Sequence, residues 1–176
     1  MNRRDAIRHV SLLLGGMISV PAMAGVNGEI LNFGDSVTVT AEQEALLAEL
    51  ADVIIPTTST PGAKAAGVEK FIVRVMRDCY PKEEQEKFYS GLTQLNSESR
   101  TKFSKSFVEL DNGQKIDMVK ATTGSNKPFF LRMKELTVTG YFTSEIGATK
   151  ALEYLPIPGR FEGCVPLKPG QKAWAL

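Results

Sequence analysis

The residues best suited to chemistry lie in one segment, where Ser144 and Glu145 follow Tyr141. A serine beside a carboxylate can be read as a nucleophile and its base, but a carboxylate without an imidazole activates a hydroxyl poorly. The only histidine of the chain, His9, lies near the N-terminus. The same Ser-Glu pair is common at helix ends. We therefore predict a structural role for it and no catalytic residue in this chain.

The sequence has no nucleotide-binding G-x-G-x-x-G and no phosphate loop ending in Gly-Lys-Ser/Thr, and it also lacks the G-x-S-x-G elbow that carries a nucleophilic serine in hydrolases. Glu83, Glu84 and Glu86 lie beside lysines in a pattern typical of a solvated helix face. A net charge of +1 offers nucleic acid no basic surface. We expect no cofactor, metal ion or nucleic acid to be bound by this chain itself.

The first 24 residues are typical of an export signal. Arg3 and Arg4 precede an apolar run from Val10 to Val20, and the small-residue pattern that follows predicts cleavage after Ala24. The run is too short to span a bilayer, which needs about 20 apolar residues. Adjacent arginines favour the twin-arginine pathway, which carries folded proteins, although general secretion of an unfolded chain stays open.

Cleavage at this position would leave a periplasmic protein without histidine, because His9 departs with the signal. Such a protein has no histidine-dependent triad, no c-type haem attached through C-x-x-C-H and no imidazole-ligated metal. The loss of three arginines and Asp5 would change the net charge from +1 to −1. Residues 25–176 fit a single globular domain.

Cys79 and Cys164 are an even pair in an oxidising compartment, so we predict that they form an internal disulfide. A bond to a partner's cysteine and two buried thiols remain the alternatives. Trp174, the only tryptophan, lies in a tail too rich in proline to bury it alone. It is a candidate interface anchor, or it packs on the core of this protein.

Apolar residues at three- and four-residue steps predict an all-α fold of about five to six helices in residues 41–176. Thr40 and Gln43 form a capping box that starts the first helix, and Pro56 ends it near Ile55. Further helices are expected over residues 68–79, from Pro81 through Leu95, over 97–110, around 116–119 and from Pro128 to 142.

The two ends of the predicted domain differ from its helical centre. Residues 25–40 form a polar, glycine-bearing arm that we expect to be extended. Residues 154–176 are rich in proline and glycine, so this tail should be irregular and held by contacts with other segments. The run 137–140 has low helix propensity and leaves a strand possible, but we favour a helix there.

Several blocks of the sequence have a specific pattern: Leu50-Ala51-Asp52-Val53-Ile54-Ile55-Pro56, Thr60-Pro61-Gly62-Ala63, Gly67-Val68, the run from Leu136 to Gly147, Ala151-Leu152-Glu153-Tyr154, Pro158-Gly159 and Gly163-Cys164. In these blocks the chain resembles the gluconate 2-dehydrogenase subunit 3 family, the small or gamma subunits of bacterial membrane-associated sugar dehydrogenases. The resemblance covers most of residues 41–167. Residues 97–127 are generic.

This resemblance implies a noncatalytic partner of a large FAD-dependent dehydrogenase of the glucose-methanol-choline type, often joined by a multihaem cytochrome c subunit. The FAD would lie in the large subunit, and the small subunit would carry the export signal for both and meet the membrane only through the complex. Candidate contact residues are Tyr141, Phe142, Ser144, Glu145, Gly147, Pro158, Gly159 and Trp174. The alternative is a stand-alone periplasmic enzyme or binding protein.

Overall fold

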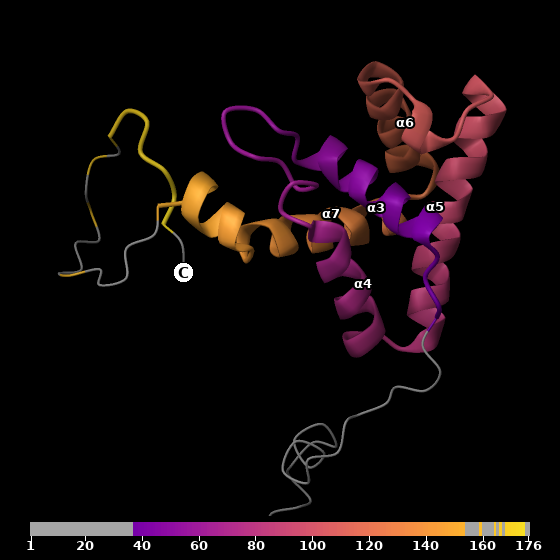
Figure 1. The fold of residues 1–176 in the computed structure, drawn as a ribbon, viewed down its shortest axis with the longest axis horizontal. Coiled ribbons are helices and arrows are strands. Elements are labelled where there is room, and N and C mark those ends of the chain that lie inside the picture. The colour runs from indigo at the N-terminus through magenta and orange to yellow at the C-terminus, as the bar shows by residue number, and fades with distance from the viewer. Residues whose placement is uncertain (1–36, 154–158, 160–163, 165, 167, 175–176) are drawn as a thin grey trace, which may run out of the picture. The chain divides into compact units, whose positions relative to one another are not determined.

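The computed structural model describes residues 37–153, 159, 164, 166 and 168–174. These residues form α3 (Ala41–Ile54), α4 (Val68–Cys79), α5 (Lys82–Phe103), the 3-10 turn η1 (Phe107–Glu109), α6 (Asn112–Ser125), α7 (Lys127–Phe142) and the short π-helix η2 (Gly147–Ala151) (Figure 1). The described part of the chain contains no β-strand, only an isolated bridge between Glu153 and Trp174. The all-α prediction is confirmed. The predicted signal with Arg3, Arg4 and Ala24, and nearly all of the arm, lie outside the described residues.

Local hydrogen bonds fix where α3 and α6 begin, the first as predicted; α6 is longer than the helix expected around 116–119. The Thr40 side chain accepts a hydrogen bond from the Gln43 amide, and the Gln43 side chain accepts one from the Thr40 amide. Asp111 and Gln114 form the same reciprocal box at the start of α6. Each box satisfies amide groups that a helix leaves free in its first turn. The run 137–140 is helical, within α7.

The separate helix predicted over residues 97–110 is wrong, because α5 continues without a break from Lys82 to Phe103. The hydroxyls of Ser99 and Thr101 donate to carbonyl oxygens one turn back, at Leu95 and Ser97, so these polar residues do not interrupt the helix. The helix ends at Ser104, which has a left-handed φ of 55°. Only the short turn η1 follows.

The core lies around α3, which contacts α4, α5, α6, α7 and η1. Figure 1 shows α7 passing behind α3, and α7 also contacts α4, α5 and α6. Each helix contributes apolar side chains at three- and four-residue spacing, and burial of these side chains is the main source of stability. The most deeply buried include Leu47, Leu50, Ile72, Met76, Leu92, Leu95, Phe107, Met118 and Met133.

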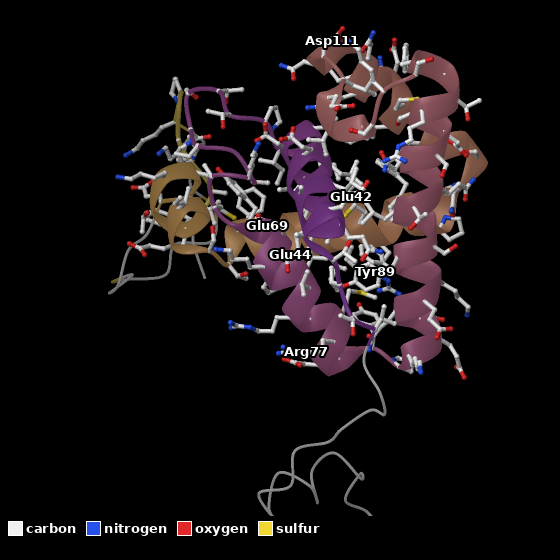
Figure 2. All side chains as sticks on the ribbon, turned by 45° about the vertical axis from the view of Figure 1, so that its right-hand side comes forward. Glu42, Glu44, Glu69, Arg77, Tyr89 and Asp111 are labelled. Carbon is white, nitrogen blue, oxygen red and sulfur yellow. The ribbon has the colours of Figure 1, made fainter. Side chains whose placement is uncertain are left out.

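Polar side chains connect α3 to α5 and to the turn η1. Glu42, labelled in Figure 2, accepts hydrogen bonds from Asn96 (3.2 Å) and Arg100 (3.1 Å) of α5. Asn96 in turn accepts a hydrogen bond from the Phe107 amide at 3.0 Å, so one buried amide side chain joins α3, α5 and η1.

Glu49 makes a second connection, with Lys115 of α6 at 2.7 Å and with Lys64. The Lys115 and Glu49 side chains are only 9% and 16% exposed. Burial alone would raise the pKa of Glu49, but the hydrogen bonds donated by Lys115 and Lys64 outweigh it and hold this pKa below its ordinary value of 4.5. The carboxylate therefore stays charged and fixes α6 against α3.

Candidate partner interface

The loop after α3 and the C-terminal end of α7 meet through one hydrogen bond. The Tyr141 hydroxyl donates to the Pro61 carbonyl oxygen at 2.7 Å, and the Tyr141 side chain is only 2% exposed. Two of the sequence blocks that carry the family resemblance therefore touch each other, although they are 80 residues apart. Tyr141, predicted as a contact residue, is placed in the core.

The loop itself is folded tightly around Gly62. A Cβ atom at this position would lie 2.6 Å from the Thr57 amide nitrogen and 2.7 Å from the Ile55 carbonyl oxygen. The Gly62 amide donates to Thr57 Oγ1 at 2.9 Å, and the Ala63 amide donates to the Ile55 carbonyl oxygen at 2.9 Å. The Pro61-Gly62 pair thus shapes a compact turn that presents the Pro61 carbonyl to α7.

Ser144 closes the turn that joins α7 to η2. Its hydroxyl donates to the Tyr141 carbonyl oxygen at 2.6 Å and accepts from the Gly147 amide at 3.0 Å. Gly147 is buried, and a Cβ atom there would lie 1.9 Å from the Tyr141 carbonyl oxygen. These contacts give Ser144 and Gly147 structural roles, while the neighbouring Glu145 is exposed.

Other residues of the predicted contact set are exposed. Phe142 is 40% exposed at the end of α7, and Gly159 is exposed with a left-handed φ of 67°. Trp174 is 51% exposed, and the chain around it pairs with Glu153, whose amide donates to the Ala173 carbonyl oxygen at 2.8 Å. Pro158 lies outside the described residues. The exposed members thus follow the chain from the end of α7 into the tail.

Two exposed residues of α7 were missed by the sequence reasoning. Leu131 is 52% exposed and Val138 is 37% exposed, and both lie on the same face of the helix as Phe142. Their spacing, seven residues and then four, could have revealed this face, because the buried Met133 and Gly140 lie on the opposite side. Of the apolar residues in this helix, only Tyr141 and Phe142 were named from the sequence as contact candidates.

A groove of about 400 Å³ lies where α4, α5 and the start of α7 meet. Its walls include Met76, Tyr80, Lys87, Phe88, Phe129 and Arg132. Arg132 is fixed at the rim, because it donates to the Tyr80 hydroxyl at 2.9 Å and lies 4.8 Å from the centre of that ring. The groove therefore has an apolar floor and a positioned cation at its edge.

The predicted disulfide is not formed, because Cys79 and Cys164 are exposed free thiols. Cys79 ends α4 beside the N-terminal half of α7, where Tyr80 meets Arg132. The tail pairs with Glu153, beyond the other end of α7. From Arg132 to Phe142 the helix alone spans about 15 Å. A disulfide requires Cα atoms within about 7 Å.

Within the described ranges, no three His, Cys, Asp or Glu side chains are grouped so as to hold a metal ion. None of the helices described by the structure is both long and apolar enough to cross a bilayer.

The geometry defines an all-α domain in which the sequence blocks near residues 50–67 and 136–147 pack against each other, while the outer face of α7 is apolar and exposed. A family model, Gluconate 2-dehydrogenase subunit 3, matches residues 41–159. The chain belongs to the gluconate 2-dehydrogenase subunit 3 family. Membership implies an accessory subunit of a dehydrogenase complex, together with other subunits. Comparisons with curated proteins and with solved structures found no match.

Proposed function

We propose that this protein is the noncatalytic small subunit of an FAD-dependent sugar or alcohol dehydrogenase of the glucose-methanol-choline type. It binds and stabilises the flavoprotein and carries it to the periplasm. The observation that supports the proposal is the family match over residues 41–159, which takes in every helix from α3 to η2. The FAD belongs to the large subunit, and a multihaem cytochrome c subunit is the expected electron acceptor.

The N-terminal sequence supports the export part of the proposal. Arg3 and Arg4, followed by a weakly hydrophobic run, favour the pathway that carries folded proteins. A small domain without a cofactor gains nothing from folded export by itself. A flavoprotein does, because its chain folds around FAD before it crosses the membrane.

The roles of the polar residues near the end of α7 also support a noncatalytic chain. The Ser144 hydroxyl bonds two backbone groups, and the Tyr141 hydroxyl bonds the Pro61 carbonyl. Both hydroxyls already have partners that hold the turn and the loop in place. A stand-alone enzyme using these residues has no observation in its favour.

The test replaces Arg3 and Arg4 together with lysine and measures FAD-dependent dehydrogenase activity in periplasm and cytoplasm. We expect periplasmic activity to fall by about tenfold or more and flavoprotein to accumulate in the cytoplasm, because the adjacent arginines are the address that the pathway reads.

The matched control is Arg8→Lys, which makes the same chemical change in the same segment outside the pair and should leave export unchanged. Normal periplasmic dehydrogenase activity in the Arg3, Arg4 double variant would refute the escort role.

A further inference from the structure

The outer face of α7 carries a stripe of apolar side chains, Leu131, Val138 and Phe142, which we call the α7 stripe. Their exposed fractions are 52%, 37% and 40%, and the spacing of seven and four residues places them on one side of the helix. Within the described residues only two other large apolar side chains are exposed, Ile116 and Trp174. Exposed apolar side chains that gather on one face mark an interaction surface more often than isolated ones do.

The groove between α4, α5 and α7 begins next to this stripe. Pro128 lines the groove and lies three residues before Leu131, so the two are neighbours on the helix surface. The groove floor, with Met76, Phe88 and Phe129, is apolar. A partner segment that covers the stripe can therefore place a side chain in the groove, and such anchored side chains contribute most of the binding energy of an interface.

The charges beside the α7 stripe favour an acidic partner. Lys127 and Lys134 are exposed and lie seven residues apart along one edge of the stripe. Neither makes an ion pair with any residue that the structure describes. The two cations that line the groove already have partners, because Arg132 pairs with Glu135 at 3.0 Å and Lys87 pairs with Glu84 at 3.0 Å. Two lysine charges thus remain for a partner to neutralise.

We propose that the α7 stripe and the adjoining groove form the docking surface for the dehydrogenase subunit, which covers them with an apolar segment edged by acidic residues. This inference rests on the proposed function. A second copy of this chain fits less well. In a symmetric pair both surfaces bring the same two lysines, Lys127 and Lys134, to the interface.

The test substitutes Leu131→Glu and Val138→Glu together in the full chain and measures the FAD-containing polypeptide that co-purifies from native envelopes. We expect a loss of at least about tenfold, because two apolar contacts disappear and two carboxylates meet an acidic partner. Lys134→Glu should weaken co-purification about threefold or more in low salt, and the difference should shrink as salt rises. The control is Ile116→Glu, which puts the same charge on an apolar residue of α6 that is 44% exposed.

The outcomes separate the surface from the function. If wild-type chain brings no flavoprotein, the proposed function fails. If wild type and the Leu131, Val138 double variant bring equal amounts, the docking surface is wrong while the function stands. If the double variant and Ile116→Glu lose the flavoprotein equally, the effect does not belong to α7 and the inference is also overturned. Sedimentation of the isolated protein tests whether a second copy of this chain covers the stripe instead. If the wild type is a dimer and the Leu131, Val138 double variant is a monomer, the stripe is a self-association surface and the inference is overturned.

Discussion

Two regions of this protein are held together by different means. Where the loop after α3 meets α7 and η2, backbone approaches backbone, and glycines at 62 and 147 leave less than 3 Å for a Cβ atom. Across residues 96–127, apolar side chains such as Phe107 and Met118 fill the core, and two polar side chains, Asn96 and Lys115, add links to α3. The first arrangement requires one residue type at each position, whereas the second can be replaced by other packed or polar pairs. This explains why the first region carries a recognisable sequence pattern and the second is generic.

The largest effect should come from Gly147→Ala, which attacks the backbone-packed region directly. The new Cβ atom would lie 1.9 Å from the Tyr141 carbonyl oxygen and 2.7 Å from its carbonyl carbon, and neither atom can move without displacing the end of α7. We expect the free energy of unfolding, measured by denaturant titration, to fall by about 3 kcal/mol or more.

Gly124→Ala is the matched control for that substitution. A Cβ atom at Gly124, within α6, meets nothing within 4 Å, so the same change should stabilise the protein by about 0.5–1 kcal/mol. Equal effects of the two substitutions would show that close backbone approach does not distinguish the two regions.

How much of the fold could be predicted from sequence depends on whether a feature is set by adjacent residues or by contacts with other helices. The helix start at Thr40 depends on adjacent residues, so a local pattern located it. The capping box at Asp111 is equally local, but it was missed in the sequence, and this helix was expected only around 116–119. The continuity of α5 depends on side chains that bond the preceding turn and on neighbouring helices, which local propensity does not reveal.

The site was less predictable, because exposure is decided by tertiary contacts. Tyr141 and Phe142 are adjacent aromatic residues, yet one is buried and the other is 40% exposed. The sequence gives both the same character, and only the packing of α7 separates them. The disulfide prediction failed for the same reason, since cysteine count and compartment do not report how Cys79 and Cys164, both exposed free thiols, are placed in the fold.

A medium effect should follow from Glu49→Gln, which breaks the main ion pair of the polar region. Its partner Lys115 is only 9% exposed, so the substitution leaves a largely buried ammonium group without a countercharge. We expect a loss of about 1.5–3 kcal/mol in the free energy of unfolding near pH 7. Glu84→Gln is the control, because its pair with Lys87 is exposed at 45% and 72% and should contribute far less.

The pH dependence of the stability lost in Glu49→Gln tests whether the charge of Glu49 is what holds α6 to α3. The pKa of Glu49 is lowered in the folded protein from 4.5, so its stabilisation is fully present above pH 4.5 and is lost as the pH falls through the folded-state pKa. The difference between wild type and Glu49→Gln should therefore shrink in acid. A difference that stays constant down to the lowest pH at which the protein is folded would mean that the carboxylate charge does not hold α6.

The smallest effect should come from Tyr141→Phe, which keeps the packing of the first region and removes only its one long-range side-chain hydrogen bond. The ring stays buried, and the Pro61 carbonyl oxygen loses the donor that lies 2.7 Å away. We expect thermal unfolding to report a loss of about 1–1.5 kcal/mol. Tyr80→Phe removes a hydroxyl that bonds the partly exposed Arg132, and should cost less. If Tyr141→Phe matched Gly147→Ala, the hydrogen bond rather than the backbone contact would hold the loop to α7, and the contrast between the two regions would be lost.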